Sequence, residues 1–190
     1  MFNRETAWSL LNEYTTNPAL IRHALCVEAV MRHYADLQSA DANQWGMAGL
    51  LHDFDYERYP HPPAHTREGA QILRSAGCEE EIIGAMLSHV PWNLDDYPRD
   101  RPIRTALFAA DEVSGFIYAC SLVRPERIAG LEPAGVIKKM KQKSFAASVS
   151  REDITQGAAL LGLSLEGHIK NCIDAIRGIA ETVALLPPPV

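Results

Sequence analysis

The chain has 190 residues, of which 47% are hydrophobic and 22% are charged, and these proportions fit one globular domain with a substantial core. Its 18 basic and 24 acidic residues give a net charge of −6, which argues against nucleic acid and anionic lipid as partners. We therefore expect a single domain over residues 1–190 whose partner is neither nucleic acid nor a membrane.

The four cysteines lie far apart and form no Cys-x-x-Cys pair, so they are expected to be reduced thiols in the core. The first residues lack the basic-then-apolar order of a signal peptide. No apolar run reaches the roughly 18 residues needed to span a bilayer. These features predict a cytoplasmic protein.

The spacing of the apolar residues predicts an all-α chain, because they recur every three or four positions and no alternating run rich in Val, Ile and Thr is present. Asn17-Pro18 and Asp41 are expected to cap helices, and Ser150-x-x-Asp153 resembles a capping box for another. The predicted loops are 54–63 and 90–102, and the predicted helices are 6–14, 17–37, 41–53, 66–75, 79–89, 103–123, 136–147 and 164–185, before a proline-rich tail at 187–190.

Six side chains that suit metal ligation are spread over the predicted helices, each in an apolar or small-residue context. They are His23, His52, Asp53, His65, His89 and Asp111. An adjacent imidazole and carboxylate at the end of a buried helix are costly to leave unpaired, and a metal ion is their simplest partner. Imidazole and carboxylate without thiolate suit Fe, Mn, Zn, Co or Ni. The remaining histidines, expected to be solvated, are His33, His61 and His168.

Taken singly, each histidine is more often a satisfied core or surface side chain than a ligand. The prediction of a metal site therefore depends on the whole set. Four histidines and two carboxylates are enough for two ions.

The order of these residues resembles the HD-domain superfamily of metal-dependent phosphohydrolases, in its dinuclear, six-ligand branch. The resemblance covers residues 17–125, and the C-terminal helices over 136–186 are similar only in helical character. It implies a compact helical bundle of the HD-domain type. The segments that carry it are Arg22-His23-Ala24-Leu25, Leu51-His52-Asp53-Phe54, His65-Thr66-Arg67-Glu68-Gly69-Ala70, Ser88-His89-Val90 and Ala110-Asp111-Glu112.

The resemblance also implies a role for each ligand. One divalent ion would be held by His23, His52, Asp53 and Asp111, and a second by His65 and His89, with Asp53 bridging the two. A metal-activated water would then attack the phosphate ester.

The stretch Asp55-Tyr56-Glu57 departs from the pattern of the superfamily, because many members carry Gly-Lys here or a glutamate one position earlier. The leaving group could be protonated by Asp55, by Glu57 or by a metal-bound water, and the spacing does not choose among them.

Basic and aromatic side chains could complete the site. Arg124, Lys139 and Lys141 belong to a basic part of an otherwise acidic chain and could pair with a substrate phosphate at the rim. A solvated helix face is the alternative interpretation. The aromatic residues that could stack on a base or enclose a small substrate are Tyr56, Tyr59, Trp92 and Tyr97.

The resemblance implies a phosphohydrolase, and we expect it to cleave a phosphate ester of a small nucleotide or of another phosphorylated metabolite. Two alternatives remain at this stage. An HD-type di-iron oxygenase uses the same six ligands, and a non-catalytic sensor or interaction module would keep the metal for stability. Metal content and oxygen dependence distinguish them.

Overall fold

The computed structural model describes residues 2–188, and over these residues the chain consists of helices joined by turns and loops, with no strand. The all-α class predicted above is therefore confirmed. In chain order the elements are α1 (Arg4–Tyr14), α2 (Pro18–Leu37), α3 (Ala42–Leu51), α4 (Ala64–Ser75), α5 (Glu80–Ser88), the 3-10 helix η1 (Pro91–Asn93), α6 (Pro102–Leu122), α7 (Pro133–Met140), α8 (Arg151–Leu160) and α9 (Leu165–Arg177).

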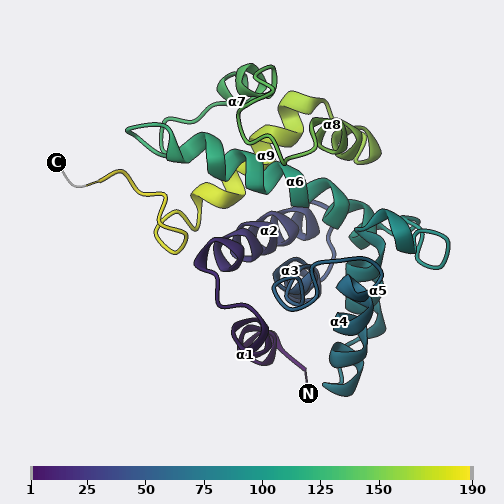
Figure 1. Cartoon of the computed structure of the whole chain (residues 1–190). Coiled ribbons are helices and arrows are strands. Elements are labelled where there is room, and N and C mark those ends of the chain that lie inside the picture. The colour runs from purple at the N-terminus through teal and green to yellow at the C-terminus, as the bar shows by residue number, and fades with distance from the viewer. Residues whose placement is uncertain (1, 189–190) are drawn as a thin grey trace.

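The helices form two groups on either side of α6, which crosses the middle of the molecule (Figure 1). Helices α1 to α5 lie on one side and α7 to α9 on the other, with the buried helix α3 enclosed by its neighbours. Helix α2 packs against α3, α6 and α9, so one long helix contacts both groups. No helix in the described part of the chain is long and apolar enough to cross a membrane.

Side-chain caps start several helices where the sequence predicts them. Asn17 Oδ1 accepts from the Ala19 amide, and Pro18 occupies the first turn, where a missing N–H costs nothing. Asp41 accepts from two amides at the start of α3, and Ser150 Oγ accepts from the Asp153 amide at the start of α8. These local bonds fix where the helices begin.

Two helices end seven or more residues before the predicted position. The helix expected over 136–147 begins at Pro133 and ends at Met140. The turns that follow it are held in a non-helical form by Arg151, which donates to their carbonyl groups, among them Ala146 O at 2.6 Å. The helix expected over 164–185 ends at Arg177, where the chain tightens into three-residue turns such as Ala180 N to Arg177 O at 3.2 Å. Residues 189–190 of the predicted tail lie outside the described residues.

The prediction that His168 is solvated is wrong, because its ring is buried between three helices. Its Nδ1 atom lies 2.6 Å from the Tyr34 hydroxyl on α2, and its Nε2 atom lies 3.1 Å from Ala109 O on α6. His61 is exposed as expected, and His33 is half-buried.

Candidate metal centre

The six histidines and aspartates singled out above lie in two neighbouring groups. In each group the three candidate ligand atoms lie within 4.8 Å of one another. The first group draws on α2, the end of α3 and α6, and the second on the end of α3, the start of α4 and the end of α5. The two groups are His23, His52 and Asp111, and Asp53, His65 and His89.

The first group joins three elements at one point. His23 Nε2 lies 3.0 Å from Asp111 Oδ1 and 3.2 Å from His52 Nε2. The distance from His52 Nε2 to Asp111 Oδ1 is 3.5 Å. His52 is buried, whereas His23 and Asp111 are each partly open to solvent, so one side of the group can be reached.

Asp53 spans the two groups with its two oxygens. Its Oδ1 atom lies 3.2 Å from both His65 Nε2 and His89 Nε2, in the second group. Its Oδ2 atom faces the first group at 3.5 Å from His52 Nε2. One carboxylate is therefore shared by both sets of side chains.

The second ring nitrogen of three histidines shows what the site can bind. Nδ1 of His52 lies 2.7 Å from Gly49 O, Nδ1 of His89 lies 2.5 Å from Met86 O, and Nδ1 of His65 lies 2.9 Å from Asp55 Oδ1. These acceptors assign a proton to Nδ1, so Nε2 is the ring nitrogen that faces the carboxylate oxygens. Each Nε2 atom needs a cation between itself and these oxygens, either a proton or a metal ion, and this donor set fits divalent metal ions.

The charges of the two groups shift their pKa values accordingly. Burial lowers the pKa of His52, but Asp53 and Asp111 more than offset it and raise the value to about 9. Burial likewise opposes the charged form of His65, yet its carboxylate partners raise that pKa to about 9. Burial raises the pKa of Asp53 and of Asp111, and the histidines lower both pKa values well below the ordinary range. The two groups of side chains therefore favour a bound cation between the imidazole rings and the carboxylates.

Asp55 lies behind His65 and is fully buried. Besides the bond to His65, its Oδ2 atom accepts from the amides of Thr66 and Gly69 at 2.8 and 3.0 Å. Thr66 has a φ of 68°, a left-handed conformation that a β-branched residue rarely adopts. The carboxylate of Asp55 therefore holds the start of α4 in the shape that points His65 at Asp53.

A pocket of about 220 Å³ opens in front of the two groups, and ligand residues from both of them line it. Its aromatic walls include Tyr56 and Trp92, whose rings lie 5.3 and 6.0 Å from the ring of His65. Sequence reasoning anticipated these two aromatic residues. Tyr59 and Tyr97, named with them, are not part of this lining.

Two carboxyl groups at this pocket were missed by the sequence reasoning. Glu112 and Asp153 both line it. In a full capping box Asp153 would accept from the Ser150 amide, but Glu112 Oε2 takes that amide at 3.0 Å. Burial and the neighbouring Asp111 raise the pKa of Glu112 to about 7. The only sequence signal for Glu112 was its position beside Asp111.

Several residues predicted for the site lie elsewhere. The Glu57 carboxylate accepts from the Thr16 hydroxyl at 2.6 Å and from the Asn17 amide at 3.0 Å, at the start of α2. Arg124 and Lys139 line a separate hollow near the end of α6, and the exposed Lys141 lines neither that hollow nor the pocket of the metal centre. None of these four side chains is brought to the metal groups.

Comparison with known proteins agrees with this arrangement. Residues 20–113 match the HD domain family. The chain therefore contains an HD domain, and the superfamily predicted from the sequence is confirmed. No curated protein sequence gives a significant match.

Two similar solved structures come from one protein. The HD domain of the L. monocytogenes phosphodiesterase PgpH aligns with a TM-score of 0.53 and 16% identity, over 90% of this chain and 98% of that one. The same domain in complex with cyclic-di-AMP aligns with a TM-score of 0.51 and 15% identity, over 96% of this chain and all of that one. At such low identity the likeness concerns the fold.

Proposed function

We propose that this protein is a metal-dependent phosphohydrolase that cleaves a phosphate ester of a small nucleotide or of another phosphorylated metabolite. The observation that carries the proposal is the convergence of imidazole Nε2 atoms and carboxylate oxygens in two adjacent groups, with members of both groups lining one open pocket. The HD domain and the fold shared with a phosphodiesterase that was crystallised with cyclic-di-AMP support the same reaction class.

In this proposal two divalent ions are bound, one by His23, His52 and Asp111 and the other by His65 and His89, with Asp53 shared between them. Such ions supply Lewis acidity toward phosphoryl oxygens and lower the pKa of water. The protein would hold these ions through rings that are already oriented, because in three histidines the partner of Nδ1 turns Nε2 toward the site.

The other residues of the pocket act on the substrate. Tyr56 and Trp92 flank the metal groups and offer aromatic faces to a nucleobase or another flat moiety. We assign proton transfer to the leaving group to Glu112 or Asp153, because both line the pocket. Asp55 acts as a positioning residue through His65, and Glu57 stabilises the start of α2.

The test is a metal analysis of freshly purified protein followed by phosphate release from a panel of mono- and diesters with each divalent ion. We expect hydrolysis that stops on chelation and that falls at least 100-fold in Asp111→Asn. Asp100→Asn is the matched control, since Asp100 lies on the surface beside Arg104 and outside this pocket. Oxygen uptake without phosphate release would instead identify an oxygenase, and a chelator-sensitive fold without turnover on the whole panel would identify a structural metal site.

A further inference from the structure

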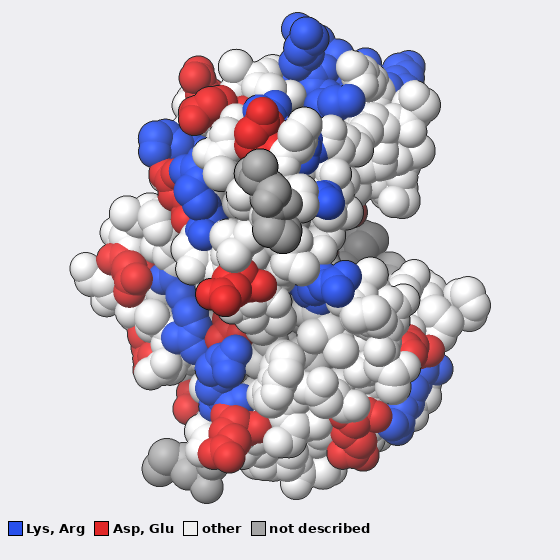
Figure 2. All heavy atoms as spheres, turned by 90° about the vertical axis from the view of Figure 1, so that its left-hand side faces the viewer, with Lys and Arg blue, Asp and Glu red and all other residues white. Residues whose placement is uncertain are grey.

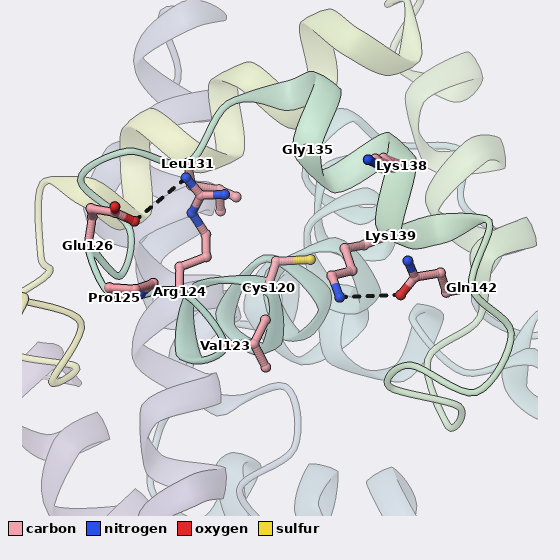
Figure 3. A pocket seen from close by; sticks show the side chains of 10 residues that line it. All are labelled: Cys120, Val123, Arg124, Pro125, Glu126, Leu131, Gly135, Lys138, Lys139 and Gln142. Carbon is pink, nitrogen blue, oxygen red and sulfur yellow. Dashed lines mark hydrogen bonds and ion pairs between the residues drawn. The ribbon is translucent and has the colours of Figure 1, made fainter.

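A second hollow, apart from the metal centre, lies between the end of α6 and helix α7 (Figure 3). Its volume of about 470 Å³ is about twice the 220 Å³ of the pocket at the metal groups. The two share no lining residue. At a rise of about 1.5 Å per residue, Cys120 in this hollow lies roughly 14 Å along α6 from Asp111.

The lining of the hollow is strongly cationic. Arg124 lies on one side and Lys138 and Lys139 on the other, with Cys120 between them (Figure 3). Glu126 is the one acidic residue in the lining, so the local formal charge is +2 in a chain whose net charge is −6. Figure 2 shows Lys and Arg side chains gathered at the upper end of the molecule, the end where α7 lies in Figure 1.

Neither Arg124 nor Lys139 donates a hydrogen bond to a carboxylate in the lining. Arg124 Nη2 donates to Gly130 O at 2.8 Å, but the nearest Glu126 oxygen is 3.9 Å away. Arg124 Nε is enclosed and has no hydrogen-bond partner among the described residues. Lys139 Nζ donates at 3.2 Å to the neutral side-chain oxygen of Gln142. A ligand in the hollow does not reach the enclosed Nε atom, but Lys138, Lys139 and the exposed part of the Arg124 guanidinium can bind an anion through charge-assisted hydrogen bonds.

Cys120 lies in the electrostatic field of these cations. Burial raises the pKa of this thiol to about 11, although Lys139, Arg151 and Arg124 each act to lower it. The rest of the lining is partly apolar, since Val123 and Leu131 contribute to it. The hollow therefore combines cationic donors with an apolar wall.

We propose that this hollow is a second binding site, separate from the metal centre, for a small organic phosphate monoester. A phosphate dianion matches the local charge of +2, and Arg124, Lys138 and Lys139 provide donors to its oxygens. The volume is within the range of sites that enclose small molecules, and Val123 and Leu131 can contact the organic part of the ligand. This site does not depend on the reaction proposed above.

Isothermal titration of the full chain with AMP tests the proposal, with adenosine as the uncharged comparison and with chelator present, so that AMP is neither hydrolysed nor bound by metal at the first site. We expect AMP to bind, adenosine to bind at least tenfold more weakly, and the affinity for AMP to fall as salt is added. In Lys138→Gln/Lys139→Gln the affinity for AMP should fall at least tenfold. Arg124→Gln should have the same effect, and its melting curve shows whether loss of the bond to Gly130 alters folding.

Two controls distinguish AMP binding in this hollow from binding elsewhere on the molecule. The double variant Arg101→Gln/Lys170→Gln removes two positive charges outside the hollow, where each is paired with a carboxylate, and should bind AMP like the wild type. Asp111→Asn, which alters the metal centre, should also retain AMP binding. The proposal is overturned if AMP does not bind, if adenosine binds equally well, or if Asp111→Asn abolishes binding while the lysine variant retains it.

Discussion

Asp55 and Glu57 are separated by one residue, yet their carboxylates are used in different places. Asp55 is buried and accepts from His65 and from two amides of α4, whereas Glu57 accepts from the start of α2. Hydrogen bonding to Thr16 and Asn17 lowers the pKa of Glu57. At the scale of single residues, the partners of a carboxylate determine its role, and chain position alone does not.

We predict that Asp55→Asn weakens the binding of divalent metal about 10- to 100-fold, the usual cost of losing the partner of a ligating histidine. An amide has one accepting atom, so it cannot serve His65 and both amides as the carboxylate does. Competition with a chromophoric chelator measures the affinity. Glu57→Gln is the control and should bind metal like the wild type, and equal affinity in Asp55→Asn would contradict the positioning role.

Sequence reasoning singled out the six histidines and aspartates that the structure brings together in two groups, because their types and order are distinctive. It could not distinguish Asp55 from Glu57, since a buried carboxylate that accepts from His65 and an exposed carboxylate two positions later look alike in the sequence. Arg124 and Lys139 were expected near the substrate because they are basic residues in an otherwise acidic chain and could pair with a phosphate. The length of α6 instead places Arg124 at the second hollow, where Lys139 of α7 also lies.

At the scale of elements, the metal centre depends on the close packing of α3 against α2. A Cβ atom at Gly49 would lie 2.9 Å from Glu28 N and 2.9 Å from the Val27 carbonyl carbon, so only glycine lets the two backbones approach this closely. Gly49 O also accepts from His52 Nδ1. The same contact therefore sets the helix spacing and the orientation of a metal-facing ring.

We predict that Gly49→Ala lowers the free energy of unfolding by about 1–3 kcal/mol, as overpacking between fixed backbones does. Gly135→Ala is the matched control, since its added Cβ would have its nearest neighbour at 3.9 Å, and it should leave stability unchanged or raise it by up to about 1 kcal/mol. Urea denaturation measures both. Equal stabilities for the two variants would show that α3 can move away from α2 without cost.

The helix starts were easier to predict than the helix ends, for a physical reason. A cap such as Asn17 or Asp41 bonds to amides two or three residues away, so the signal is local. The end of α7 depends on Arg151, which lies beyond the helix and bonds back to the intervening turns. A pattern read in one window of sequence does not contain that contact.

At the scale of the whole molecule, His168 joins the two groups of helices. It lies on α9 and contacts Tyr34 on α2 and Ala109 on α6, so its ring connects α9 with α2, the helix that packs against α3. Burial lowers the pKa of His168 to about 4, from an ordinary value of 6.5, despite its bond to Ala109 O. The neutral ring is the form that this junction requires.

This shift predicts how stability depends on pH. Between pH 6.5 and about 4 the unfolded chain binds a proton at His168 and the folded chain does not, so stability is fully present above pH 6.5 and is lost as the pH falls. By pH 5 the loss should reach about 2 kcal/mol. Urea denaturation of the wild type and of His168→Gln at pH 7 and pH 5, both with chelator, measures the difference. The variant should be less stable at pH 7 but should lose about 2 kcal/mol less on acidification.

The chelator keeps both proteins free of metal during the measurement. The contribution of His52 and His65 to the pH dependence is then common to both proteins and cancels in the difference. His61→Gln supplies the matched control, because it removes a histidine ring that is exposed and lies outside the helix junction. Parallel losses in the wild type and His168→Gln would mean that the native protein accepts a proton at His168. The two groups of helices would then have to separate far enough near pH 5 to hydrate this ring, and the junction could not be the rigid contact inferred here.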